Sequence, residues 1–282
     1  MFYHYTTLEG LKGIIQDRIF FATQAPFLND ESEVRHTFDL LRDILNKKMI
    51  IQEMSSKRSG SYEPFRGQVL TSLVNVFSNP HALINPVKSY ICSFTRNGNL
   101  LSQWRAYGGN NGSISIGFDE EQLKKFCKEQ GMSIFECVYE HEKKRVSINE
   151  QVEKFLQESY LKNGGSFDQE LLEQKFEQLT MEIFHKSLFF KHHSFHEEKE
   201  HRIVCHQKLA ESEAYGIKFR TGDIGLIPYV CLPILQKLPI GNIYIGPNKN
   251  SHLIKIAVDE LLEKEELKIF GEIISSDIPY RT

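Results

Sequence analysis

The sequence lacks closely spaced cysteines, a long hydrophobic run and a leader-like start. Its cysteines are odd in number, lie far apart and form no C-x-x-C pair, which indicates free thiols rather than a disulfide framework or a zinc cluster. They are Cys92, Cys127, Cys137, Cys205 and Cys231. The longest apolar stretch, residues 226–235, is broken by Pro228 and Pro233 and is too short to span a bilayer. We expect a cytoplasmic protein with no membrane association.

An excess of charge of one sign is also absent, since 34 Lys and Arg face 37 Asp and Glu for a net charge of -3. This balance does not favour strong general binding to a polyanion, although it allows a local basic groove. With 40% hydrophobic residues, the composition excludes a disordered chain. The length of 282 residues allows one large domain or a smaller domain that carries an insertion, and we expect the second.

Several catalytic signatures are missing. The glycines match neither G-x-G-x-x-G nor the P-loop, and no G-x-S-x-G elbow or cysteine-hydrolase signature occurs. Histidines crowd residues 192–206, but His196-Glu197 is followed by His201, one residue beyond the H-E-x-x-H spacing. The sequence therefore predicts no metal site, no P-loop and no serine or cysteine hydrolase.

Hydrophobic periodicity predicts strands interspersed with helices rather than a regular βαβ series. Strands are expected at residues 2–6, 19–23, 89–94, 112–118, 132–139, 201–206, 217–220, 242–245 and 267–274. One helix is expected after a Thr6-x-x-Glu9 capping box, and a second follows the turn-rich residues 26–30 and ends at about Asn46. Further helices are expected at residues 65–77, at residues 100–107 before Gly108-Gly109, at residues 120–130 behind an Asp119 cap, and at residues 251–264. Residues 147–191 have helical spacing broken at residues 163–166. We therefore expect a single α+β domain over residues 1–282, with central mixed or antiparallel sheets, flanking helices and a helical hairpin inserted at about 147–191.

Two early segments offer candidate site residues. Strand alternation places Phe2, His4 and Thr6 on one face and Tyr3 and Tyr5 on the other. His4 is either a ligand for a substrate hydroxyl or a histidine bonded within the core. In the segment Phe27-Leu28-Asn29-Asp30, Asn29 or Asp30 caps the next helix or belongs to a loop that closes over a ligand.

Two later segments are more informative. Trp104 and Tyr107 are three residues apart on one helix face and form either a stacking wall for a planar ring or part of the core. If residues 198–204 form a strand, Glu198, Glu200 and Arg202 share a face, which makes them the best catalytic candidates. The alternative is an exposed charged strand with cross-strand ion pairs.

Several segments of this chain, in their order along the sequence, resemble those of a widespread bacterial family of unknown function, DUF2971. The segments that carry the resemblance are Tyr3-His4-Tyr5-Thr6, Phe27-Leu28-Asn29-Asp30, Ser93-Phe94, Leu101-Ser102-Gln103-Trp104-Arg105-Ala106-Tyr107, Ile116-Gly117-Phe118, Glu198-Lys199-Glu200-His201-Arg202 and Ile245-Gly246-Pro247. The family name itself implies no activity.

His4, Tyr107 and the Glu198-x-Glu200 pair are also similar in type and order to the elements of the ADP-ribosyltransferase fold. This resemblance implies that NAD is a substrate, with His4 on its ribose or adenosine part and Tyr107 and Trp104 stacked on nicotinamide. It further implies that Glu200 stabilises an oxocarbenium-like transition state and that Glu198 orients the acceptor. The expected cofactor-binding set is completed by Tyr5, Thr6, Arg105 and Arg202, with the two arginines on the pyrophosphate. The chain departs from that fold in lacking a Ser-Thr-Ser element.

These observations favour an NAD-dependent ADP-ribosyltransferase-like protein that modifies a protein, a nucleic acid or a small acceptor, such as a toxin or a phage-defence effector. A non-catalytic module of bacterial defence or stress response that binds a nucleotide or a partner protein is the alternative. A metal-dependent nuclease using Glu198, Glu200 and nearby histidines is a third possibility.

Overall fold

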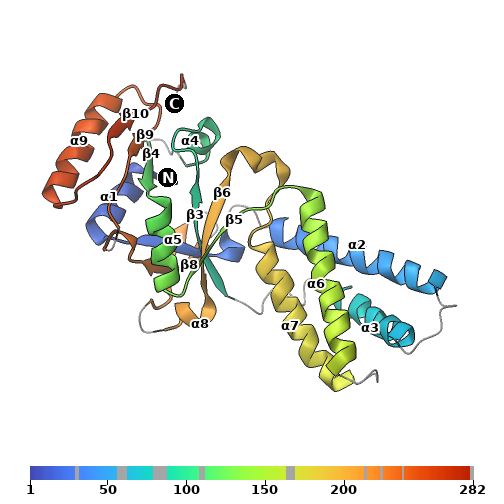
Figure 1. The fold of residues 1–282 in the computed structure, drawn as a ribbon. Coiled ribbons are helices and arrows are strands. Elements are labelled where there is room, and N and C mark those ends of the chain that lie inside the picture. The colour runs from blue at the N-terminus through green and yellow to red at the C-terminus, as the bar shows by residue number, and fades with distance from the viewer. Residues whose placement is uncertain are drawn as a thin grey trace. The chain divides into compact units, whose positions relative to one another are not determined.

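The computed structural model describes residues 1–28, 32–55, 62–78, 88–107, 112–162, 169–212, 215–222, 225–236 and 238–279. The chain forms two compact units, drawn in Figure 1. The sheet unit consists of Met1–Leu28, Ser89–Cys137 and Phe195–Thr282, and the helical unit consists of Asn29–Lys88 and Val138–Ser194. The chain therefore leaves the sheet unit twice and returns twice.

Among the described residues, the sheet unit holds ten strands in one mixed sheet. Their bounds are β1 (Phe2–Thr7), β2 (Phe20–Gln24), β3 (Ser89–Thr95), β4 (Ser113–Phe118), β5 (Ser133–Glu136), β6 (Glu200–His206), β7 (Lys218–Gly222), β8 (Gly225–Leu232), β9 (Ile243–Ile245) and β10 (Ile273–Ser275). The strand order is β10-β9-β4-β1-β3-β2-β8-β7, and β6 pairs with both β3 and β5. The described strand pairs are antiparallel apart from the parallel pair β9 and β10.

Helices accompany this sheet, and each of them apart from the short α8 lies where the sequence predicts a helix. They are α1 (Leu8–Asp17), α4 (Leu101–Tyr107), α5 (Glu120–Glu129), α8 (Gln207–Ala210) and α9 (Ser251–Lys264). Helix α9 has the predicted bounds and connects β9 to β10, beside which it lies in Figure 1. The α+β class with a central mixed sheet and flanking helices is confirmed.

A large and a small cluster of hydrophobic side chains cover opposite faces of the sheet. The core face carries Phe2, Phe94, Ile116 and Ile203, which belong to the main hydrophobic cluster. Tyr3 and Tyr5 form a second cluster with Trp104 of α4. The alternation predicted along the first strand is therefore present, because successive side chains of a strand point to opposite faces.

Within its described residues, the helical unit has four long helices. They lie side by side in Figure 1. They are α2 (Ser32–Ser55), α3 (Tyr62–Phe77), α6 (His141–Lys162) and α7 (Gln169–Ser187). Helices α6 and α7 occupy most of the segment for which the sequence predicts a helical hairpin. Both α2 and α3 pack against them, so residues 29–88 belong to this unit as well.

Three local expectations need correction. Helix α1 is capped by Thr7, whose hydroxyl accepts from the Gly10 amide at 3.0 Å, because β1 continues through Thr6 and pairs it with Ile114. Helix α2 continues past Asn46 to Ser55, where Gln52 contacts Glu63 and Arg66 of α3. The proline-containing stretch 225–232 forms β8, which pairs with β2 only from Tyr229 onward, so no β2 acceptor is opposite Pro228.

A shorter helix, η3 (His193–Glu198), precedes β6, and η1 (Ala25–Phe27) and η4 (Ile234–Gln236) are single turns. Among the described residues, no helix combines the length and the apolar composition that crossing a membrane requires.

Candidate functional site

The side chain of His4 lies beside the edge of β3, between the places where two strands pair with this edge. One edge of β3 is shared by two strands, since β1 pairs with it at Thr95 and β2 pairs with it at Tyr90 and Ile91. The His4 Nδ1 atom lies 2.9 Å from the Ser93 carbonyl oxygen, in the part of this edge between the two partners. The ring also packs against Phe20 and Phe94. His4 therefore supplies a hydrogen bond that a continuous strand would otherwise make.

The environment of His4 keeps the imidazole neutral. Desolvation among these aromatic rings lowers its pKa, and the contact with the Ser93 carbonyl opposes this effect only in part. A neutral imidazole that donates from Nδ1 retains Nε2 as an acceptor. His4 can thus accept a hydrogen bond from a hydroxyl group, as the ribose role requires, but from the core face of the sheet.

The opposite face brings together a different set of predicted residues. Tyr3 is opposite Thr95 in β3, and Thr95 is opposite Glu200 in β6. Ser93 is likewise opposite Arg202. Directly paired residues point to the same face of a sheet. Tyr3, Tyr5, Thr95, Glu200 and Arg202 therefore share one face, which we call the tyrosine face.

The strand register separates His4 from Glu200. His4 is opposite Ile116 of the core face, whereas Glu200 projects from the tyrosine face. His201, the neighbour of Glu200, confirms this assignment, because its ring centroid lies 4.4 Å from that of Phe2. The register therefore does not bring His4 and Glu200 together in one cleft. Glu200 instead shares its face with Tyr3 and Tyr5.

Glu200 and Arg202 form a buried ion pair at the start of β6. Arg202 Nε donates to Glu200 Oε1 at 2.9 Å and Nη2 donates to Oε2 at 3.3 Å, so the guanidinium engages both carboxylate oxygens. The two residues are only 4–5% exposed. Because two charges lose their hydration here, the pair is stable only with both partners present.

Glu198, the first glutamate of the predicted pair, does not lie in the same element as Glu200. Lys199 has a φ of 43°, in the left-handed region, so β6 begins after it and Glu198 belongs to η3. The Thr95 hydroxyl donates to the Glu198 carbonyl oxygen, and His201 Nδ1 lies 3.0 Å from the Lys199 carbonyl oxygen. The expectation that Glu198 shares a strand face with Glu200 is therefore wrong, because the backbone turns between them. Thr95, which the sequence analysis did not select, holds this turn.

Trp104 is part of the core of the tyrosine face. It is 2% exposed, packs edge-on against Tyr5 at a centroid distance of 4.6 Å, and donates from Nε1 to Asn99 Oδ1 at 2.9 Å. The Tyr5 hydroxyl donates to the Asn97 carbonyl oxygen and accepts from the Leu100 amide. Burial raises the pKa of Tyr5 well above its usual value. Both rings thus fix the segment 97–100 ahead of α4, and Trp104 is not accessible for stacking on a ligand.

The accessible candidates lie at the end of α4. Tyr107 is 36% exposed, Arg105 is exposed, and Thr6 of β1 is half-buried. Tyr107 can therefore present its ring, and Arg105 its guanidinium, to an incoming ligand. The Gly108-Gly109 helix end and the Asn29 and Asp30 cap candidates lie outside the described residues.

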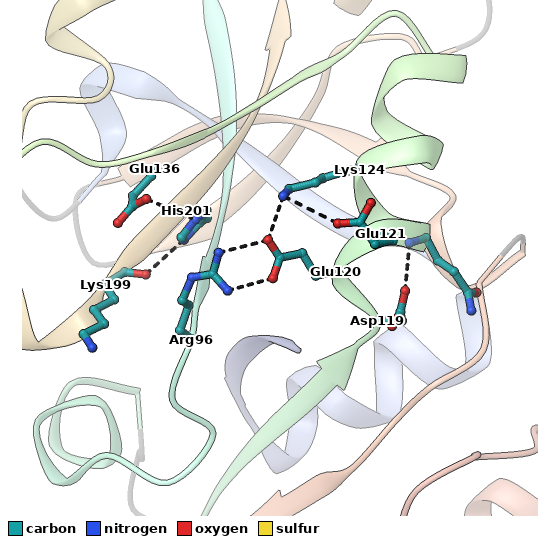
Figure 2. A network of polar contacts seen from close by, with 9 residues as sticks. Arg96, Asp119, Glu120, Glu121, Lys124, Glu136, Lys199 and His201 are labelled. Carbon is teal, nitrogen blue, oxygen red and sulfur yellow. Dashed lines mark hydrogen bonds and ion pairs between the residues drawn. The ribbon is translucent and has the colours of Figure 1, made fainter.

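A second polar cluster borders the core face at the end of β3. Figure 2 shows the Arg96 guanidinium and the Lys124 ammonium directed at the Glu120 carboxylate. Arg96 donates to Glu120 at 2.7 and 2.9 Å, and Lys124 donates to it at 2.7 Å. The Arg96–Glu120 contact attaches the start of α5 to the end of β3. The Asp119 side chain, which accepts from the Gln122 amide, caps the same helix.

We expect Glu120→Gln to lower the free energy of unfolding by up to about 1 kcal/mol, the range of exposed ion pairs. Hydrogen bonds from Arg96 and then from Lys124 lower the pKa of Glu120 to about 2. Because the folded pKa lies below the unfolded one, this stabilisation is complete above the unfolded pKa and decreases as the pH falls towards the folded pKa. Denaturant titrations between about pH 7 and 3 should show a weaker acid dependence in the variant. Glu121→Gln, at an 86% exposed side chain, is the matched control, and an equal effect there would contradict the prediction.

The histidines near β6 are dispersed. His193 and His196 are exposed in η3, His201 is buried on the core face, and His206 is half-buried at the end of β6. Within the ranges that the structure describes, no group of three His, Cys, Asp or Glu side chains could hold a metal ion.

Comparison with known proteins gives one match. Neither a curated protein nor a solved structure matches this chain. Residues 103–203 match the model of a family described as a protein of unknown function (DUF2971). The matched segment begins in α4 at Gln103, contains Trp104, Arg105 and Tyr107, and ends within β6 after Glu200 and Arg202. The resemblance to DUF2971 is thus supported over the segment that joins the end of α4 to the buried ion pair.

Proposed function

We propose that the sheet unit binds an NAD-like nucleotide at the tyrosine face, beside the end of α4. The observation that carries this proposal is the position of the buried Glu200–Arg202 pair on the face that also holds Tyr3 and Tyr5. Tyr3 and Glu200 are two strand spacings apart, about 10 Å, which is the scale of a nucleotide.

Each part of the nucleotide has a partner of suitable chemistry in this proposal. The exposed ring of Tyr107 stacks on a base or on nicotinamide, and the exposed Arg105 binds phosphate oxygens. Arg202 lies deeper and holds the Glu200 carboxylate in a fixed orientation towards the ligand. The nucleotide would come from the cytoplasm, which is part of the proposal.

A non-catalytic binding module is the form of the proposal that the geometry favours. A carboxylate that stabilises an oxocarbenium-like centre acts through oxygens that face the sugar, and here both Glu200 oxygens accept from Arg202. His4 also faces the other side of the sheet. Such a module would serve in bacterial defence or stress response by sensing a nucleotide and passing the signal to a partner protein.

An NAD-dependent ADP-ribosyltransferase is the second candidate. It is favoured by the burial of the Glu200 carboxylate, because a fixed charge in a water-poor site interacts strongly with developing positive charge. In this form, Glu200 is the catalytic residue, Glu198 orients the acceptor, and the acceptor is a protein or a nucleic acid. A role as a toxin or a phage-defence effector would follow from this candidate.

Calorimetric titration with NAD tests the proposal. We expect the wild-type protein to bind NAD and Tyr107→Ala to bind it roughly 5- to 150-fold more weakly, because base–aromatic stacking contributes about 1–3 kcal/mol. His4→Gln, on the core face, should bind NAD as the wild type does. Loss of affinity in His4→Gln but not in Tyr107→Ala would place the ligand on the core face, and no binding at millimolar NAD would refute the proposal.

Release of nicotinamide separates the two candidates. A transferase or NAD hydrolase releases nicotinamide, and Glu200→Gln should abolish the release while NAD still binds. A binding module binds NAD but releases no nicotinamide from it. Circular dichroism of Glu200→Gln verifies that the variant is folded.

A further inference from the structure

The helical unit contains a cationic pocket, and none of its lining residues belongs to the sheet unit. A cavity of about 250 Å³ is lined by Arg35, His36, Asp39, Lys144, Phe190, Lys191 and His192. The lining contains three basic side chains, from one arginine and two lysines, and two imidazoles, whereas Asp39 is its one carboxylate. Asp39 also pairs with Arg42 of its own helix, which compensates its charge.

Two helix N-terminal segments meet at this pocket. Arg35 and His36 lie in the first two turns of α2, and Lys144 lies in the first turn of α6. The rings of His36 and His141 are 6.2 Å apart, so the two segments are close in space. The N-terminal end of a helix carries partial positive charge, which favours an anion. The backbone therefore adds to the positive potential of the side chains.

Lys144 is the most deeply placed cation of the lining. It is 3% exposed, its Nζ donates to the Lys191 carbonyl oxygen at 2.6 Å, and it lies 6.0 Å from the centroid of the Phe190 ring. The contact also fixes the segment 190–192 against α6, which holds Lys191 and His192 at the cavity.

We propose that this pocket binds a dianionic phosphate group, either as inorganic phosphate or as the phosphate of a small phosphorylated compound. Arginine, lysine and imidazole donors around one cavity are the groups that bind phosphate oxygens. The volume is below the range of about 300–1,000 Å³ typical of pockets for drug-sized ligands, which favours a small anion. The proposal is independent of the nucleotide at the tyrosine face.

The pKa of His36 reflects desolvation and the positive potential of the lining. Its pKa is lowered first by desolvation, then by the nearby Lys144, His141 and His192, while Asp39 opposes them. A phosphate dianion in the pocket reverses the sign of the local potential and favours the imidazolium. The imidazole of His36 should therefore titrate at a higher pH when phosphate is bound than when it is absent.

Calorimetric titration of the full-length protein with inorganic phosphate at low ionic strength is the test. We expect saturable binding that weakens with added salt and is at least ten-fold weaker in both Arg35→Gln and Lys191→Gln, because each removes one cation from the lining. These residues are preferable to the buried Lys144, whose replacement could unfold the unit. Arg145→Gln, which removes the same charge from an exposed α6 residue paired with Glu142, is the matched control and should bind as the wild type does.

Competition experiments with other anions show which ligands the pocket accepts. Adenosine monophosphate should compete with inorganic phosphate if the pocket accepts a phosphate ester, and failure to compete would restrict the site to the free ion. Chloride and acetate, which carry one charge, should not compete at equal ionic strength. An absence of phosphate binding in the wild type, or an equal loss in Arg145→Gln, would overturn the proposal.

Discussion

Arg202→Met is expected to lower the free energy of unfolding by about 3–5 kcal/mol, the cost of leaving one partner of a buried ion pair uncompensated. Arg202 and Glu200 are only 4–5% exposed, so water cannot replace the lost guanidinium. The carboxylate of Glu200 would remain within the tyrosine face without the two hydrogen bonds from Arg202. Urea denaturation followed by circular dichroism measures the change.

Two additional variants show whether burial of the ion pair causes the loss of stability expected for Arg202→Met. Arg96→Met removes an arginine directly after β3 whose side chain is 39% exposed and pairs with Glu120, and we expect a loss of no more than about 1 kcal/mol. The double variant Glu200→Leu/Arg202→Met removes both charges and should recover much of the stability that Arg202→Met loses. A double variant less stable than Arg202→Met would show that the pair is not the main interaction of these residues.

Gly117→Ala is expected to destabilise the protein by about 1–3 kcal/mol through overpacking. Gly117 is directly opposite Tyr3 in the pair β1 and β4. A Cβ atom at Gly117 would lie 2.7 Å from Tyr3 Cε1 and 3.0 Å from the Asn242 carbonyl oxygen. The carbonyl belongs to the backbone and accepts from the Gly117 amide, so it cannot move away without loss of that bond.

Gly13→Ala is the matched control for this substitution. Gly13 lies within α1, and a Cβ atom there would meet no other atom within 4 Å. Alanine in a helix interior is more favourable than glycine by roughly 0.5–1 kcal/mol, so this variant should be more stable than the wild type. Thermal unfolding of the two variants should give shifts of opposite sign. A stabilised Gly117→Ala would contradict the close approach of Tyr3.

Two glycines in the segments that resemble DUF2971 have a packing role that the sequence alone does not indicate. Gly117 accommodates the Tyr3 ring, and at Gly246 a Cβ atom would lie 3.0 Å from Trp104 Cε3. Both contacts join residues more than 100 positions apart in the chain. A glycine within a strand suggests close approach of another group, but the identity of that group depends on strand register.

The sequence predicts well what depends on local geometry. The faces of β1 follow from the alternation of side chains, and the bounds of α9 follow from helical periodicity. The cap at Asp119 is also predicted, because its side chain accepts from a backbone amide three residues later in the chain.

The composition of the candidate site depends on non-local pairing and is harder to predict. Whether Glu200 faces His4 or Tyr3 is decided by the pairing of β6 with β3, which no residue near Glu200 encodes. The turn at Lys199 also removes Glu198 from the strand. The cationic pocket draws Arg35, Lys144 and Lys191 from three distant segments and has no sequence motif.

The pairing of β2 with β8 has a consequence for synthesis of the chain. Phe20 is opposite Leu232, so more than 200 residues must be translated after β2 before its partner exists. The described helices of the helical unit end at Ser187, whereas the sheet receives its last described strand at Ile273–Ser275. On the ribosome, the helical unit therefore has all of its described helices while the sheet unit still lacks β6 through β10. The apolar side of β2 stays uncovered by β8 until those later residues are translated.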